Sequence, residues 1–190
     1  MEPRRPAVPS SANRVRIIGG RFRGRIVRFP AEPGLRPTPD RVRETLFNWL
    51  GQDLAGRWTL EPYAGTGVLS LESISRGAAG AVAIDCNATL VRALAQTART
   101  FGAQGLEAHA ADARAWLGRD ERHYDVIFCD PPFATDPWTW LLDAAAARLA
   151  PGGFIYAESG RPLSPPAALR VARADKAGHV HYHLLARAVD

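Results

Sequence analysis

Short apolar runs alternate with segments of helical periodicity along most of the chain, which is typical of an α/β domain. Five runs rich in β-branched and aromatic residues predict buried parallel strands: residues 58–63, 81–84, 106–110, 124–129 and 154–158. Between them, apolar spacing predicts helices over residues 68–76, 87–101, 113–117 and 138–149. Residues 168–174 and 179–186 then predict an antiparallel hairpin. The expected fold is a seven-stranded, mostly parallel sheet that ends in this hairpin.

The first part of the chain has a different pattern, with short apolar runs among many arginines. Residues 15–18 and 21–29 predict two strands joined by a Gly-Gly turn. Because side chains alternate along a strand, Arg21, Arg23 and Arg25 are expected to share one face. The sequence thus predicts a small, arginine-faced hairpin ahead of the main domain.

A helix is expected to follow this hairpin and its loop. Thr38 is placed to cap the helix, Pro39 suits its first position, and Gly51 ends it. The residues before the hairpin hold too little apolar surface to offset the entropy of ordering. The chain therefore divides into a flexible tail of residues 1–13, a basic hairpin and loop of residues 14–37, and a main domain of residues 38–190.

Charge is distributed unevenly over these parts. Residues 1–43 hold eleven arginines against three acids, a formal charge of +8, whereas the remaining 147 residues carry −3. A basic arm on a mildly acidic body points to a polyanionic partner. No apolar run approaches the ~20 residues that cross a membrane, and no signal-like core follows the N-terminus. We therefore expect a cytoplasmic protein with no membrane partner.

The strand at residues 124–129 ends at Asp130, Pro131, Pro132 and Phe133. Ligands bind at the carboxyl ends of the strands in open α/β sheets, so this turn is expected to face a crevice. A carboxylate and a proline-turn carbonyl can accept the two hydrogens of an exocyclic amine, and Phe133 offers a face for stacking a base. The alternative is a strand-end turn with a helix-entry aspartate.

A second group of residues at the same edge of the sheet suggests a nucleoside cofactor. Gly65 and Gly67 form a tight turn after the first predicted strand, and Asp85 ends the next strand at a spacing suited to binding ribose hydroxyls. Asp112 follows the third strand and can accept a hydrogen bond from an adenine amine. Either aspartate can instead cap a helix, although Asn87 is at least as well placed as Asp85 to do so.

Basic residues near the first helix suggest contacts with phosphate. Arg36, Arg41 and Arg43 lie close to the predicted helix N-terminus, where backbone N–H groups also attract anions. The alternative is a solvated helix face, which the spacing suits equally well.

Three alternating histidines near the C-terminus invite a metal interpretation. His179, His181 and His183 would lie on one strand face about 7 Å apart, which is too far for one tetrahedral zinc with bonds of ~2.0–2.1 Å. We expect an outward polar face and no metal.

Several motifs together resemble one enzyme family. Residues 16–20 (RIIGG), 34–50 (GLRPTPDRVRETLFNWL) and 75–78 (SRGA), together with the Asp-Pro-Pro-Phe turn, resemble the bacterial 16S ribosomal RNA guanine-N2 methyltransferases of the RsmD type. The resemblance runs from about residue 15 to the end. It implies the S-adenosylmethionine-dependent, Rossmann-like methyltransferase fold. It also implies a monomeric enzyme that methylates the N2 amine of one guanine in 16S rRNA within a small-subunit assembly particle.

This resemblance assigns roles to the residues singled out above. The catalytic group is Asp130, Pro131, Pro132 and Phe133; the S-adenosylmethionine group is Glu61, Tyr63, Gly65, Gly67, Asp85 and Asp112; the RNA-binding group is Arg21, Arg23, Arg25, Arg36, Arg41 and Arg43. Glu61, Pro62 and Ser70 depart from the usual family pattern, so cofactor affinity is open. Two alternatives also stay open: an adenine-N6 methyltransferase on DNA or RNA, and a catalytically silent RNA-binding protein of ribosome assembly.

Overall fold

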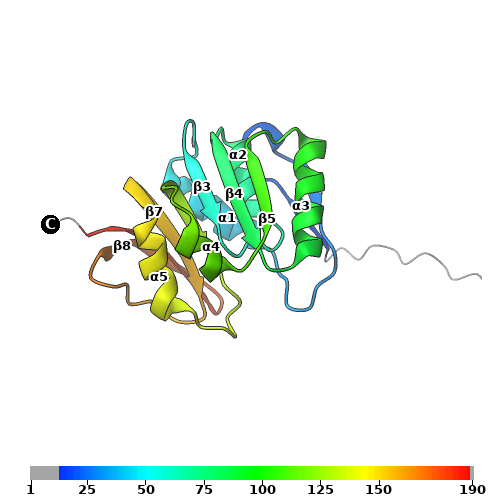
Figure 1. Cartoon of the computed structure of the whole chain (residues 1–190). Coiled ribbons are helices and arrows are strands. Elements are labelled where there is room, and N and C mark those ends of the chain that lie inside the picture. Colours follow the sequence, from blue (N-terminus) through cyan, green and yellow to red (C-terminus); the bar gives the residue numbers. More distant parts are fainter. Residues whose placement is uncertain (1–12, 189–190) are drawn as a thin grey trace, which may run out of the picture.

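A seven-stranded sheet forms the centre of the computed structural model, which describes residues 13–188 (Figure 1). The strands are β3 (Trp58–Glu61), β4 (Gly80–Asp85), β5 (Leu106–Ala110), β6 (Tyr124–Cys129), β7 (Leu149–Ser159), β8 (Leu169–Ala177) and β9 (Val180–Arg187). Their order is β5-β4-β3-β6-β7-β9-β8, and β9 runs antiparallel to both of its neighbours, β7 and β8. This confirms the predicted mostly parallel sheet and its C-terminal hairpin. The predicted tail lies outside the described residues except for Asn13.

Helices cover both faces of the sheet (Figure 1). They are α1 (Asp40–Leu50), α2 (Val68–Ser75), α3 (Ala88–Phe101), α4 (Ala113–Arg119) and α5 (Trp138–Ala147). Alternate strand residues pack on opposite sides: Phe128 joins the core under α1 to α3, whereas Ile127 joins the core under α4 and α5. This alternation decides which face each strand-end side chain meets. Within the described residues, no helix is both long and apolar enough to span a membrane.

The N-terminal hairpin exists, but the predicted second strand over residues 21–29 is wrong. The paired strands are β1 (Arg14–Arg16) and β2 (Ile26–Arg28), and a 3-10 turn, η2 (Gly20–Phe22), lies between them. Phe22 is buried, and its backbone N–H donates to the Ser75 hydroxyl of α2 at 2.9 Å. This long-range anchor bends the chain where local alternation favoured a strand. Arg21, Arg23 and Arg25 therefore do not form the face of a regular strand.

A different set of arginines occupies the outer face of the hairpin. Antiparallel pairing joins Arg14 to Arg28 and Arg16 to Ile26, and all four side chains are exposed. Val15 and Val27, which alternate with them, are buried. The hairpin is amphipathic as predicted, but its basic face is built by Arg14, Arg16 and Arg28.

The predicted N-cap of helix α1 is Thr38, but the helix begins at Asp40. Its N-cap is Pro39, and no side chain caps it, so the prediction for Thr38 is wrong. Thr38 is buried, and its backbone carbonyl accepts a hydrogen bond from the Arg43 Nε at 3.0 Å. Gly51 ends the helix in the left-handed conformation, with φ of 93°, as predicted.

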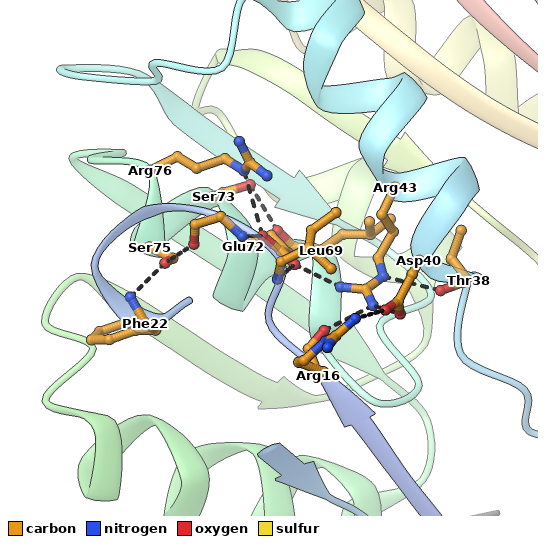
Figure 2. A network of polar contacts seen from close by, with 12 residues as sticks. Arg16, Phe22, Thr38, Asp40, Arg43, Leu69, Glu72, Ser73, Ser75 and Arg76 are labelled. Carbon is orange, nitrogen blue, oxygen red and sulfur yellow. Dashed lines mark hydrogen bonds and ion pairs between the residues drawn. The ribbon is translucent and has the colours of Figure 1, made fainter. Parts of the chain in front are cut away.

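A buried polar network joins the hairpin to α1 and α2 (Figure 2). Glu72 of α2 is fully buried and accepts hydrogen bonds from the backbone N–H groups of Ile18 (2.6 Å) and Gly19 (3.3 Å). The Nη1 of Arg43 on α1 lies 2.6 Å from the same carboxylate, and the Arg76 Nε lies 3.4 Å from it. One carboxylate therefore holds three segments that are far apart in the sequence.

Arg43 completes this network from the other side. It is fully buried, its Nε donates to the Thr38 carbonyl at 3.0 Å, and its Nη2 donates to the Arg16 carbonyl at 2.8 Å. The Nη2 also lies 2.5 Å from an Asp40 carboxylate oxygen. Arg43 thus fixes the residues that precede α1 against both the hairpin and α2.

Replacing Arg43 with Met should strongly destabilise the protein, because it leaves Glu72 as a buried charge that has lost its closest cation. Breaking one partner of a buried ion pair costs about 3–5 kcal/mol of unfolding free energy. Urea unfolding would measure this. Arg16→Met is the matched control, because Arg16 forms an exposed ion pair with Asp40, a kind worth about 0–1 kcal/mol. Equal losses in the two variants would contradict the role given to Arg43.

Candidate active site

Three neighbouring parallel strands, β3, β6 and β7, carry carboxyl groups at their carboxyl ends: Glu61, Asp130 and Glu158. The register pairs Leu60 with Ile127, and Cys129 with Ala157. Those four residues face the α4 and α5 side of the sheet. The three carboxyl groups, one position further along, therefore face the opposite side, toward α1.

Burial perturbs all three carboxyl groups. It raises the pKa of Glu61 from 4.5 to about 8, even though the Ser70 N–H (3.0 Å) and hydroxyl (2.5 Å) both donate to its Oε2. Burial also raises the pKa of Asp130 well above its usual value, and the nearby Glu158 and Glu61 raise it further. The pKa of Glu158 is raised by burial, while hydroxyl donors from Tyr156 and Thr38 oppose that effect. The cluster favours protonated carboxyls until a cation approaches.

The turn after β3 brings its backbone close to neighbouring segments. Gly65 and Gly67 have φ of 51° and 68°, in the left-handed region that favours glycine. A Cβ on Gly67 would lie 2.4 Å from the Leu94 Cδ2 of α3, and a Cβ on Gly65 would lie 2.9 Å from the Leu35 Cδ1. Any larger residue would displace these side chains. The turn therefore forms a close-fitting backbone surface at the edge of the sheet.

Asp85 ties the end of β4 to this turn. Its Oδ2 accepts the Gly65 N–H at 2.8 Å and its Oδ1 accepts the Asn87 N–H at 2.8 Å. Asn87 caps α3 by accepting from Thr89 and Leu90, so Asp85 does not need to do so. Each Asp85 oxygen keeps a second lone pair, and the residue is partly exposed. Asp85 can therefore bind a ligand hydroxyl while it holds the turn.

Asp112 and Tyr63 lie near the same edge. Asp112 is the N-cap of α4 and accepts the Ala115 N–H at 2.8 Å, so its capping alternative is observed. Its carboxylate remains exposed and retains free acceptor sites. Tyr63 is half-buried, and burial raises its pKa to about 12, which keeps its hydroxyl neutral. The predicted cofactor residues thus follow β3, β4 and β5.

The Asp-Pro-Pro-Phe turn extends from β6 beside these residues. The Pro132 carbonyl accepts the Thr135 N–H (2.9 Å) and hydroxyl (2.8 Å), which engages it within the turn. Pro131 is buried, whereas Phe133 is 52% exposed. Asp130 is partly exposed at the start of this turn, so one four-residue turn offers both a carboxylate and an exposed aromatic ring, the groups that a stacked base with an amine requires.

Two of the predicted RNA-binding arginines hold the hairpin on α3. Arg25 donates to the carbonyls of Thr100 (3.1 Å) and Phe101 (3.2 Å), and its guanidinium lies 3.8 Å from the centre of the Phe101 ring. Arg21 donates to the Gly102 carbonyl at 3.3 Å. These carbonyls are the unpaired acceptors that every helix C-terminus presents. Both arginines therefore have a structural role.

The other predicted arginines differ in exposure. Arg23, Arg36 and Arg41 are exposed. The prediction that Arg43 binds RNA is wrong, because its side chain is fully buried in the network around Glu72. Helical spacing alone placed Arg43 beside Arg41 at the helix start, and it could not show that a buried glutamate on another helix would bind it.

The histidine prediction is wrong at one position. His183 is buried rather than outward-facing, and its Nε2 accepts the Leu163 N–H at 3.4 Å. The segment after β7 covers that face, which a local pattern cannot reveal. Residues 13–188 contain no group of three His, Cys, Asp or Glu side chains arranged to hold a metal ion.

Sequence reasoning missed Glu158 and misassigned Thr38. Glu158 ends the fifth predicted strand at the position that Asp130 occupies after the fourth, so the repeated strand-end acid was the available signal. Thr38 gave no such signal, because its burial and its contact with the Arg43 side chain depend on how α1 packs.

Replacing Glu61 with Gln should flatten the pH dependence of stability. A carboxyl whose pKa is raised on folding stabilises the protein below its unfolded pKa, and this stabilisation is lost as pH rises through the folded pKa. The shift from 4.5 to about 8 sets an upper bound of about 5 kcal/mol for the loss over this range. Urea unfolding at several pH values would measure it. Parallel wild-type and variant curves would contradict the assignment, and exposed Glu121→Gln is the control.

Comparisons with known proteins show which family this chain resembles in sequence and in fold. The family model described as conserved hypothetical protein 95 matches residues 15–186. The Ribosomal RNA small subunit methyltransferase D of Escherichia coli K12 is 37% identical over 188 residues, covering 94% of this chain and 92% of that protein. A solved structure titled putative methyltransferase yhhF from Escherichia coli is 36% identical, with a TM-score of 0.83, covering 93% of this chain and 99% of that one.

A more distant structure shares the fold. The Thermus thermophilus 16S rRNA N2 G1207 methyltransferase (RsmC), solved with AdoMet and guanosine, is 24% identical with a TM-score of 0.68; the match covers 96% of this chain and 52% of that one. The chain therefore belongs to the conserved hypothetical protein 95 family, and the predicted kinship with the RsmD-type ribosomal RNA methyltransferases is confirmed.

Proposed function

We propose that this protein transfers the methyl group of S-adenosylmethionine to the N2 amine of one guanine in 16S rRNA. The observation that carries the proposal is Asp130, which is partly exposed at the end of β6, three positions before the exposed Phe133 and one strand away from the glycine turn of β3. The substrate is RNA within a small-subunit assembly particle, and the enzyme acts as a monomer.

The residues present fit S-adenosylmethionine. Gly65 and Gly67 form a tight left-handed turn at the carboxyl end of β3, the edge at which ligands bind in such sheets, and Asp85 presents free lone pairs for ribose hydroxyls. Asp112 retains an exposed carboxylate for the adenine amine. Glu61 is a buried carboxyl whose raised pKa would fall beside the positive charges of the cofactor. When bound, the cofactor supplies a methyl group activated by a sulfonium.

The protein has to position the amine and accept its hydrogens. The nitrogen lone pair of guanine N2 is conjugated into the ring, so the nitrogen becomes nucleophilic as its N–H groups are held by acceptors. Asp130 and the Pro131 carbonyl are those acceptors, since the Pro132 carbonyl is engaged by Thr135. The raised pKa of Asp130 makes its carboxylate a stronger proton acceptor as the nitrogen gains the methyl group. The target base must leave its stack, which costs a few kcal/mol.

Incubation with labelled S-adenosylmethionine and undermethylated small subunits, followed by nucleoside analysis, tests this function. We expect the label in N2-methylguanosine. Because the same turn can bind any exocyclic amine, label only in N6-methyladenosine would assign an adenine methyltransferase instead. Binding of RNA without any transfer would assign a catalytically silent assembly protein. Naked rRNA run in parallel shows whether the particle is required.

Asp130→Asn should lower the single-turnover methylation rate by about 10²–10³ while largely preserving the affinity for S-adenosylmethionine. Asp85→Asn is the matched comparison, because it should weaken cofactor binding by about ten- to a hundred-fold through the loss of a charged hydrogen bond. Stopped-flow methylation and calorimetry separate the two effects. A wild-type rate in Asp130→Asn would exclude it from the reaction, and unchanged affinity in Asp85→Asn would exclude that residue from the cofactor site.

The RNA is expected to contact the exposed arginines of the hairpin and of the α1 entrance. From the predicted set these are Arg23, Arg36 and Arg41, and the outer face of the hairpin adds Arg14 and Arg28. Their guanidinium groups are suited to bind phosphate. Arg21 and Arg25 are excluded from the test set because changing them would also release α3.

Changing Arg14, Arg23 and Arg28 together to Ala should flatten the salt dependence of RNA binding. Each lost phosphate contact reduces the slope of log affinity against log salt by about 0.7–0.9, so three contacts give roughly two units. Filter binding over a salt series would measure this. The control replaces Arg170, Arg173 and Lys176, which are exposed on the edge strand β8, with Ala. Equal slopes in the two variants would show that the hairpin does not contact RNA phosphates.

A further inference from the structure

The loops that follow β6 and β7 are joined beside Phe133. Strand β7 ends at Ser159, and a Cβ on the next residue, Gly160, would lie 3.8 Å from the Phe133 Cδ2, an ordinary van der Waals distance. Further along the turn, the Arg161 Nη2 donates to the Asp136 carboxylate, at 3.1 Å to Oδ1 and 3.3 Å to Oδ2. The loop after β7 therefore lies against the turn that begins with the proposed catalytic aspartate.

Both partners of this ion pair are held by their backbones. Ser159 is buried, and its hydroxyl donates to the Arg161 carbonyl at 2.5 Å. Asp136 has φ of 36°, in a region that few residues other than glycine adopt and that aspartate and asparagine tolerate best. The guanidinium of Arg161 is thus positioned before any ligand arrives, which lowers the ordering cost of binding one.

Arg161 can bind a second group while it is paired with Asp136. Both hydrogen bonds to Asp136 use the same nitrogen, whereas a guanidinium carries five N–H donors on three nitrogens, so this ion pair does not use Nε or Nη1. The Arg161 side chain is 60% exposed, and that of Asp136 is 61% exposed. Ion pairs this exposed contribute little to stability, so changing either partner should leave the fold intact.

Arg161 lies on the opposite side of the site from the basic hairpin. The hairpin packs on α2 and α3 through Phe22 and Arg25, whereas Arg161 follows β7. In the sheet, β7 and the glycine turn of β3 lie on opposite sides of β6. A contact at Arg161 would therefore hold RNA from the side that the hairpin does not reach.

We propose that Arg161 binds a phosphate group next to the target nucleotide while the base of that nucleotide stacks on Phe133. Guanidinium groups bind phosphate oxygens through paired N–H donors, and the contact of Gly160 with Phe133 places Arg161 one residue from the stacking surface. Asp136 orients the guanidinium and also limits the affinity for phosphate, because its negative charge faces the same group. The identity of the nucleotide rests on the proposed function, whereas a phosphate contact at Arg161 can be measured without methyl transfer.

The salt dependence of binding to undermethylated small subunits separates a phosphate contact from a purely structural ion pair. Arg161→Ala should flatten the slope of log affinity against log salt by about 0.7–0.9. Asp136→Asn weakens the same ion pair but keeps the phosphate-binding group and suits the left-handed backbone, so it should keep the wild-type slope without loss of affinity. Arg161→Lys keeps a positive charge and should also keep the slope.

Arg173→Ala, which removes an exposed arginine from the edge strand β8, is the control for that measurement and should behave as wild type. An unchanged slope in Arg161→Ala would overturn the proposal. Equal flattening in Arg161→Ala and Asp136→Asn would also overturn it, because the two residues would then act only through their ion pair.

Site-directed cross-linking tests where the contact lies. Arg161→Cys would carry a photoactivatable aryl azide in a Cys86→Ser background, which removes the exposed native thiol. On undermethylated small subunits we expect cross-links, mapped by primer extension, immediately next to the guanine that receives the methyl group. Arg173→Cys with the same reagent should not mark that position. Cross-links from Arg161→Cys only at distant nucleotides would overturn the placement beside the target.

The two proposals fail separately. If wild-type protein transfers no methyl group to guanine N2 but Arg161→Ala alone flattens the slope, the proposed function fails and the phosphate contact stands. If methylation proceeds and Arg161→Ala leaves the slope unchanged, the phosphate contact fails and the function stands.

Discussion

The buried pair of Arg43 and Glu72 is the interaction on which the arrangement of the site depends. Helix α2 starts directly after Gly67 and α1 starts directly after Pro39, so the pair fixes the helix that follows the glycine turn of β3 against the helix that follows the loop of residues 30–39 (Figure 2). The same carboxylate binds the backbone of the hairpin at Ile18. A buried charge that satisfies three segments at once tolerates few alternative packings, which gives the site a defined geometry.

The carboxyl groups at the carboxyl-terminal edge of the sheet lie in a different electrostatic environment from that of Glu72. Glu61, Asp130 and Glu158 lie on three adjacent strands, and burial raises the pKa of each. Where Glu72 has a guanidinium partner, Glu61 has the hydroxyl and N–H of Ser70, and Glu158 has the Tyr156 hydroxyl. Such a cluster lowers the stability of the ligand-free protein, and a cationic ligand would relieve it.

Most of the sheet and the residues at its strand ends were predictable, because both depend on local pattern. An apolar run that stops at Asp85 or Asp130 specifies a strand and its end together. The errors arose where a distant residue decides the local conformation. The Ser75 hydroxyl accepts the Phe22 N–H and interrupts the predicted strand, and the Glu72 carboxylate binds the Arg43 side chain that was predicted to contact RNA. These partners lie 53 and 29 positions away, so neither alternation nor helical spacing contains them.

The charge analysis has the same limit, because the number of arginines in a segment does not show which of them are buried. The clustering of arginines before residue 44 predicts a surface that binds a polyanion. In the structure, the arginines of this cluster lie in three different environments. Arg43 is buried against carboxylates, Arg25 binds helix carbonyls, and Arg14 and Arg28 face solvent. Only the last class leaves its guanidinium donors free for phosphate, so the net charge of a segment overstates the part available to RNA. The basic arm therefore connects parts of the fold through its buried and half-buried arginines, and only its outer face leaves guanidinium groups exposed to solvent.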